Sequence, residues 1–278
     1  FEESLLKAIR SLETGVNHLY MHKFKTEETD SLMDYIKIGT DDRIYAIAEL
    51  LRRGCEVSVI AAETRIDRFF LDKMQKIVDM EKELKQCLGD KAVLYQAKKM
   101  GFSDKAIAWL WDKKETDIFK MRKDAHIFPV YKMIDTCASE FESYVPYFYS
   151  TYEIENESVI EDRKKIIVLG SGPIRIGQGV EFDYSTVHAV KTIKEAGFEA
   201  IIINNNPETV STDYTTSDKL YFEPLCVEDC LNVIELEKPD GIIASLGGQT
   251  AVNLAKPLED CGVKIIGTDC AAIEKAEN

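Results

Sequence analysis

Two polar segments, the first of them rich in glycine, hold the residue types best suited to binding a ligand. One runs from Gly170 to Gly179 (GSGPIRIGQG), and the other runs from Asn204 to Asp213 (NNNPETVSTD). A third, shorter segment contains Gly247, Gly248 and Gln249. Glycine lets a backbone approach a ligand closely, and the N–H groups at the start of a following helix can bind an anion. The candidate binding residues are therefore Gly170, Gly172, Gly177, Gly179, Asn204, Gly247, Gly248 and Gln249.

Neither of the two familiar nucleotide-binding motifs fits the first segment. A dinucleotide fingerprint needs a third glycine where Arg175 stands, and a Walker A loop needs a lysine where Gln178 stands. A Rossmann-type oxidoreductase is therefore disfavoured. A glycine-rich turn in this position is also often a matter of tight packing, so ligand binding and packing both stay open.

Two carboxylates, Glu181 and Glu208, follow the first and second apolar runs of this part of the chain. If those runs are neighbouring parallel strands, both carboxylates come to the same edge of the sheet. The alternative is that they are ordinary solvated loop acids. His188 has no serine or cysteine partner at an interpretable spacing, which indicates a structural histidine.

Strands and helices alternate from Lys164 onward and would position these loops. This rhythm is typical of a doubly wound parallel sheet with helices on both faces and ligand-facing loops at the carboxyl ends of the strands. We assign this α/β domain to residues 164–278. The predicted strands are 166–169, 200–203, 241–244 and 263–266, and the predicted helices are 185–196, 228–237 and 251–260.

Up to about residue 135 the apolar residues recur at helical spacing, which predicts a set of short helices. We assign an all-helical domain to 14–150 and a linker to 151–163. Asp41 and Ser103 are candidate N-caps. The aromatic-rich stretch near 144–152 resembles a platform for stacking nucleic-acid bases. Its acidic surroundings favour packing between domains instead.

Composition excludes several partners. The 278 residues have a formal net charge of −14, which argues against nucleic acid. We find no apolar run of about 18 residues, so we expect no membrane span. Seven cysteines without a CxxC pair indicate reduced thiols in a cytoplasm, and we expect no metal site. Phe1 begins inside an amphipathic pattern, which indicates an internal fragment.

Three long segments, KKIIVLGSGPIRIGQGVEFDYSTVHAV, IINNNPETVSTDYTTSDKLYFEPL and KPDGIIASLGGQTAVNLA, resemble the large subunit of carbamoyl-phosphate synthetases. Upstream, TRIDRFFLDKMQKIV and HIFPVYKMIDTCASEF resemble that subunit's oligomerisation domain and the linker into its second half. Residues 1–13 resemble the last helix of the preceding synthetase unit. The resemblance implies a helical oligomerisation domain followed by a Rossmann-like pre-ATP-grasp domain.

The resemblance also implies an ATP-dependent ligase. Such enzymes make carbamoyl phosphate from bicarbonate, ammonia taken from glutamine, and two ATP, for pyrimidine and arginine synthesis, and they use ATP with Mg or Mn and K. The family's ATP-grasp fold begins after the segment that ends this chain. We therefore expect no bound cofactor, no catalytic residue and no activity in these residues alone. The implied partners are the other domains of the large subunit, a glutamine amidotransferase small subunit and further copies of the chain.

Family resemblance assigns Glu181 and Glu208 to the lining of a tunnel that conducts carbamate between active sites. Carboxylates facing a narrow conduit disfavour a second negative charge, so they favour passage of neutral carbamic acid. Enclosure also keeps water from a labile intermediate. The competing hypothesis is that these residues form only a non-catalytic oligomerisation and interaction module.

Overall fold

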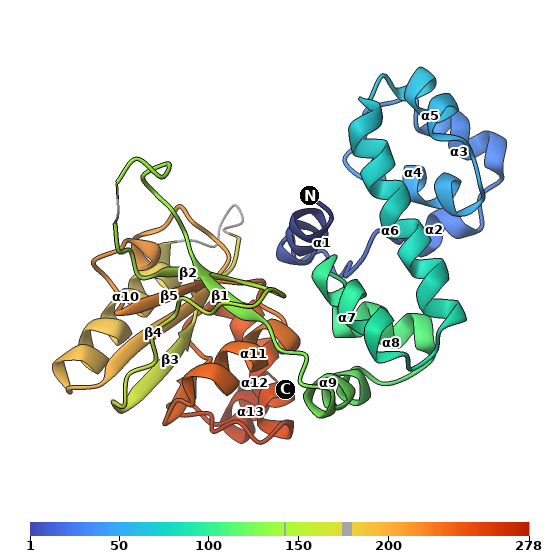
Figure 1. Cartoon of the computed structure of the whole chain (residues 1–278). Helices are drawn as coiled ribbons and strands as arrows, with labels where there is room; N and C mark the ends of the chain where they lie inside the picture. The colour runs from blue at the N-terminus through green and yellow to red at the C-terminus, as the bar shows by residue number, and fades with distance from the viewer. Residues whose placement is uncertain (142, 174–179, 278) are drawn as a thin grey trace. The chain divides into compact units, whose positions relative to one another are not determined.

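A computed structural model describes residues 1–141, 143–173 and 180–277. The chain forms two compact units, one made of residues 1–10 and 14–127 and the other of residues 11–13 and 128–278. The first unit is helical and the second is built around a sheet (Figure 1). The predicted α plus α/β class is thereby confirmed.

The helical unit is organised around its longest helix, α6, which packs against α4, α5, α7 and α8. Buried Leu71, Met74, Ile77 and Val78 recur at helical spacing and form one apolar stripe on α6. The helices described in this part of the chain are α1 (Glu2–Ser11), α2 (His22–Lys25), α3 (Thr29–Tyr35), α4 (Arg43–Arg52), α5 (Val57–Thr64), α6 (Arg68–Gln86), α7 (Lys91–Lys99), α8 (Asp104–Trp111) and α9 (Glu115–Asp124).

Buried ion pairs fix the register of several of these helices. Asp104 accepts hydrogen bonds from Arg122 at 2.6 Å and from Lys98 at 3.0 Å, which joins α7, α8 and α9. Glu81 on α6 accepts from Arg52 on α4 at 2.7 Å and contacts His18 at 2.7 Å. Because buried charges are costly unless paired, each cluster selects one arrangement of its helices.

The sheet of the α/β unit has the strand order β1-β2-β5-β4-β3-β6. Strands β1 and β2 pair antiparallel, and the other neighbours pair parallel. Figure 1 shows α10 on one side of the sheet and α11–α13 on the other. The described elements are β1 (Val130–Met133), β2 (Tyr147–Thr151), β3 (Lys165–Leu169), α10 (Val180–Glu195), β4 (Glu199–Asn204), the 3-10 turn η1 (Val210–Thr212), β5 (Lys219–Phe222), α11 (Val227–Glu237), β6 (Gly241–Ile243), α12 (Gly248–Asp260) and α13 (Cys270–Glu277).

Strands β3 and β4 are apolar at consecutive positions because both of their faces are covered. Val168 and Ile202 pack with Val190 and Ile193 of α10. Their neighbours along the strands, such as Ile201, point to the opposite face and are also fully buried. This is the pattern expected of central strands in a parallel sheet.

The structure differs from the sequence prediction in three segments. Residues 219–222 form a strand, β5, that the apolar pattern did not reveal. The predicted strand 263–266 forms only one isolated parallel bridge, between Ile265 and Ile242. The segment 128–150, which the sequence placed with the helical domain, packs with the α/β unit and contributes β1 and most of β2.

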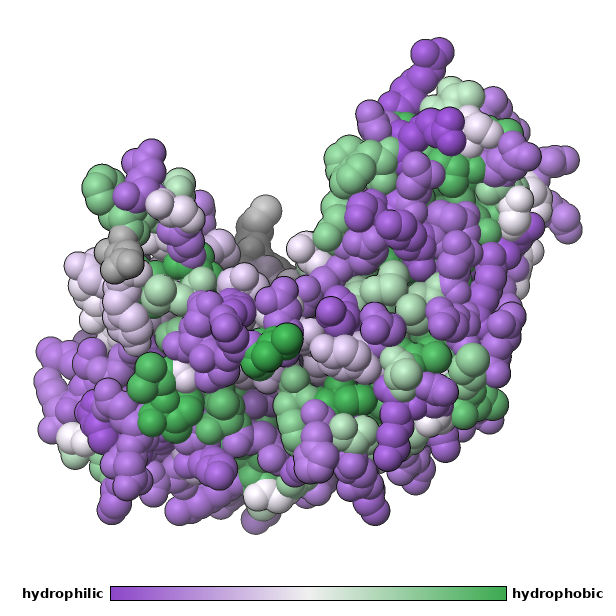
Figure 2. All heavy atoms as spheres, viewed as in Figure 1, coloured by the Kyte–Doolittle hydropathy of each residue, from purple (hydrophilic) through white to green (hydrophobic). Residues whose placement is uncertain are grey.

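Hydrophilic side chains dominate the molecular face drawn in Figure 2, in keeping with the net charge of −14. Within the described residues, no helix is both long enough and apolar enough to cross a bilayer.

Candidate functional site

The three candidate loops meet at the carboxyl edge of the parallel sheet. Strand β3 lies between β4 and β6, so the segments that follow these strands are neighbours in space. The first loop starts at Gly170, the second at Asn204 and the third just before Gly247. The sequence prediction that parallel strands bring these loops together is therefore confirmed.

Asn204 joins the first loop to the second. Its side chain is fully buried, and Oδ1 accepts hydrogen bonds from the backbone N–H of Gly172 at 3.0 Å and of Asn205 at 2.9 Å. A third, longer contact comes from the N–H of Asn206 at 3.5 Å. The Nδ2 group of Asn204 is buried and has no hydrogen-bond partner among the described residues. Asn204 therefore organises the edge, while its buried side-chain NH2 group has no partner among the described residues.

Close packing explains two of the candidate glycines. A Cβ on Gly170 would lie 2.5 Å from Cγ of Asn204, and a Cβ on Gly247 would overlap the carbonyl group of Gly170. Gly248 has φ +68° and packs against the ring of Phe182. At these positions the packing interpretation of the glycine-rich turns holds.

The two predicted tunnel carboxylates are exposed. Glu181 is the second residue of α10, and Glu208 follows Asn206, whose Oδ1 accepts from the N–H of Glu208 at 2.9 Å. Gln249 lies in the first turn of α12 and donates to Asn253 at 2.9 Å. Gly177 and Gly179 lie outside the described residues.

Sequence reasoning missed the anchors of the second loop. Asp183 on α10 is buried and accepts from the N–H of Ser211 at 3.1 Å, while the hydroxyl of Tyr147 donates to the carbonyl of Thr212 at 2.7 Å. These bonds hold η1 against α10 and β2. The acid at the fourth position of α10 is a sequence signal that could have been used, since a carboxylate near a helix N-terminus often binds backbone N–H groups.

The remaining candidates show no reactive arrangement. His188 is exposed, and its ring packs against the ring of Tyr184 with the two ring centroids 4.2 Å apart. Burial raises the pKa of the Cys230 thiol, and the negative charges of Asp229 and Glu223 raise it further. Cys226 donates to Asp229 at 2.8 Å. The described part of the chain contains no cluster of three side chains with metal-binding potential.

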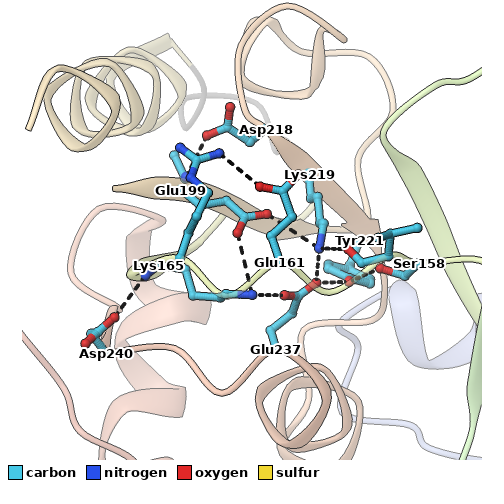
Figure 3. A network of polar contacts seen from close by, with 12 residues as sticks. Ser158, Glu161, Lys165, Glu199, Asp218, Lys219, Tyr221, Glu237 and Asp240 are labelled. Atoms are coloured by element: carbon cyan, nitrogen blue, oxygen red, sulfur yellow. Dashed lines mark hydrogen bonds and ion pairs between the residues drawn. The ribbon is translucent and has the colours of Figure 1, made fainter. Parts of the chain in front are cut away.

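The opposite edge of the sheet holds a buried ionic network (Figure 3). Lys165, Glu199 and Lys219 begin the neighbouring strands β3, β4 and β5, and Glu237 ends α11. The lysine Nζ atoms lie 2.9 and 2.8 Å from the Glu237 carboxylate, and each lies 3.5 Å from Glu199. All four residues are at most 3% exposed. The network therefore lies away from the candidate loops and fixes strand register.

Tyr221 completes this network. Its hydroxyl donates to Glu237 and contacts the Ser158 hydroxyl at 2.7 Å. Burial raises the pKa of Tyr221 well above its ordinary value, and the charge of Glu237 adds to the effect. Tyr221 is therefore a neutral donor. Charged residues at the first position of three consecutive strands were the signal that the sequence offered for this network.

Residues 162–275 match the family model described as the carbamoyl phosphate synthase preATP-grasp domain. The α/β unit, with its glycine-rich loops at the carboxyl edge of the sheet, therefore belongs to the pre-ATP-grasp class. Residues 1–126 match the oligomerisation domain of the carbamoyl-phosphate synthetase large chain. Two successive stretches thus match two domains of one protein. The chain belongs to the carbamoyl-phosphate synthetase large-chain family, as the sequence resemblance predicted.

Proposed function

We propose that this chain is part of an ATP-dependent ligase that makes carbamoyl phosphate from bicarbonate, ammonia released from glutamine, and two ATP, for pyrimidine and arginine synthesis. The helical unit supplies subunit association, and the carboxyl edge of the α/β unit forms part of the carbamate passage. The main support is that Asn204 joins the first strand-end loop to the second and Gly247 of the third loop packs on Gly170, while Glu181 and Glu208 are exposed. ATP, with Mg or Mn and K, binds in other domains of the enzyme.

The chemistry of carbamate gives these carboxylates a role. Carbamate decomposes in water, so it needs an enclosed path to the second phosphorylation site. A wall that carries Glu181 and Glu208 repels the carbamate anion and favours the neutral acid. The passage also needs little binding, because a tightly bound intermediate would not move on.

The proposed setting is a reducing cytoplasm, with the other large-subunit domains and a glutamine amidotransferase small subunit as partners. The seven cysteines form no disulfide, which agrees with such a compartment. The match to an oligomerisation domain supports association, either with other regions of the large subunit or with further copies.

Glu208→Lys in the intact enzyme tests the passage. A long cation in place of the carboxylate attracts and holds carbamate as the anion and narrows the path. The first half should continue to hydrolyse ATP while carbamoyl-phosphate formation collapses. The second half should still make ATP from ADP and added carbamoyl phosphate, because that partial reaction bypasses the passage.

Glu195→Lys is the matched control. Glu195 is an exposed acid at the far end of α10, with a side chain that is 66% accessible, so the same charge change occurs away from the loops. It should leave the ratio of product to hydrolysed ATP at the parental value. If Glu208→Lys also leaves that ratio unchanged, Glu208 is an ordinary solvated acid and the passage proposal is wrong.

A further inference from the structure

A segment distant in sequence completes the carboxyl edge. Residues 11–13 belong to the α/β unit, although the residues on both sides of them belong to the helical unit. The side-chain amide of Asn205 donates to the carbonyl of Ser11 at 3.0 Å, and the hydroxyl of Thr250 donates to Oε2 of Glu13 at 2.7 Å. Glu13 is therefore a third carboxylate at the edge that already holds the loops of Glu181 and Glu208.

The Glu13 carboxylate fits between the first loop and the third. A Cβ on Gly172 would overlap Oε1 of Glu13, so only glycine leaves room for the carboxylate at this position. On the other side, Thr250 stands in the first turn of α12, a helix of 13 residues. The positive end of the helix dipole favours a negative group there. Glu13 thus touches both walls of the gap between these loops.

The backbone of Glu13 gives a second, independent observation. Its φ is +54°, in the left-handed region that glycine adopts without strain and that other residues adopt at a cost. A left-handed residue after α1 would serve to end that helix, and glycine would do so better. The side chain therefore needs its own explanation, which the contacts with Thr250 and Gly172 provide.

We propose that Glu13 is a positioning residue for the carbamate passage. It holds the Gly170–Gly172 turn against the start of α12, and Ser11 holds the second loop through Asn205. The clamp sets the spacing of the three loops, so its loss opens the passage to water and lets carbamate escape before the second phosphorylation. This inference rests on the proposed function of the carboxyl edge.

Three substitutions in the intact enzyme separate the side chain from the backbone. Glu13→Gly removes the carboxylate and relieves the left-handed backbone, and Thr250→Val removes the donor. Each should raise the ATP consumed per carbamoyl phosphate by about fivefold, as expected when one hydrogen bond is lost from a two-state closure. Glu13→Gln keeps an oxygen acceptor for Thr250 and should stay near the parental ratio. Combining Glu13→Gly with Thr250→Val should add little, since both break one contact.

Parallel measurements distinguish the possible failures. All variants should keep the synthesis of ATP from ADP and carbamoyl phosphate, which shows that the second half is folded. If the Glu13→Gly enzyme keeps the parental ratio of ATP consumed to carbamoyl phosphate formed, the Glu13 side chain is not needed for coupling. That result would overturn its proposed role. If Glu208→Lys uncouples the enzyme and Glu13→Gly and Thr250→Val do not, the clamp alone is wrong. If none of them uncouples it, the passage and the clamp are both wrong.

Discussion

The buried ionic network at the amino edge of the sheet makes a sharp prediction about stability. Glu237 has a fully buried carboxylate that receives Lys165, Lys219 and the hydroxyl of Tyr221. Glu237→Gln keeps the size of this side chain but removes its charge. Its amide N–H group would then face at least one of the lysine ammonium groups. The substitution therefore leaves two buried cations with only Glu199 to compensate them.

The expected cost follows from that imbalance. Removing one partner of a buried ion pair typically costs about 3–5 kcal/mol, and Glu199, at 3.5 Å from each lysine, recovers part of it. We therefore expect a loss of about 3 kcal/mol, at the lower end of that range. Since domains are stable by about 5–15 kcal/mol, the α/β unit should still fold at 25 °C.

Urea titration followed by circular dichroism measures this loss. Hydrogen exchange at the amides of Ile201, Ile202 and Ile203 on β4 localises it, and these amides should exchange about a hundredfold faster if they open by global unfolding. Glu259→Gln is the control, since Glu259 pairs with Lys256 on the surface, and it should change stability by less than about 0.5 kcal/mol. If Glu237→Gln and Glu259→Gln unfold at the same urea concentration, the reasoning that the network stabilises the sheet is refuted.

Two further predictions concern the helical unit. Burial alone would raise the pKa of Glu81, but hydrogen bonds from Arg52 and His18 outweigh burial and lower it to about 2. A depressed carboxyl pKa stabilises the fold above the unfolded value of 4.5, and this stability is lost as the pH falls from there toward about 2. Acid titration should show this loss in the fluorescence of Trp109 and Trp111, which both lie on α8, and Glu81→Gln should be less stable at pH 7 and respond less to acid in that window. Analytical sedimentation of the 278-residue chain should show self-association through the helical unit at a chain concentration of about 100 μM, as expected of a specific interface of micromolar affinity. Phe69→Ser combined with Phe70→Ser should weaken the association, because these rings are 54% and 45% exposed, and a monomer at that concentration would count against a pairing role.

The sequence predicted strands with long, continuous apolar runs better than short or interrupted ones. Strands β3 and β4 are buried on both faces, so their apolar runs are continuous and easy to recognise. Strand β5 has only four residues and starts with the buried ion-pair partner Lys219. A charged residue at its start leaves an apolar run too short to be recognised as a strand. Three of the four residues 263–266 are apolar, but Gly262 and Gly267 flank the segment with φ of +86° and turn the chain after one bridge.

Caps and site residues show the same limit of local patterns. Ser103 caps α8 through the N–H of Ala106 at 3.1 Å, as predicted. At α4 the N-cap position is Asp42 rather than Asp41, and no side-chain capping bond forms there. The strand-end loops could be placed at one edge from the strand rhythm. The contacts of Glu13 with Gly172 and Thr250 could not, because they join parts of the chain that no local pattern relates.

The two edges of one sheet are thus built for different purposes. At the amino edge, charged residues are buried and paired, an arrangement that fixes strand register and offers no room to a ligand. At the carboxyl edge, Gly170 and Gly247 allow three loops to pack closely, while Glu181 and Glu208 stay exposed. Ligand-facing loops at the carboxyl ends of parallel strands follow the general rule for open α/β sheets. Distant sites without shared partners contribute independently. Substitutions at Glu237 should therefore lower stability without changing coupling, and those at Glu208 should do the reverse.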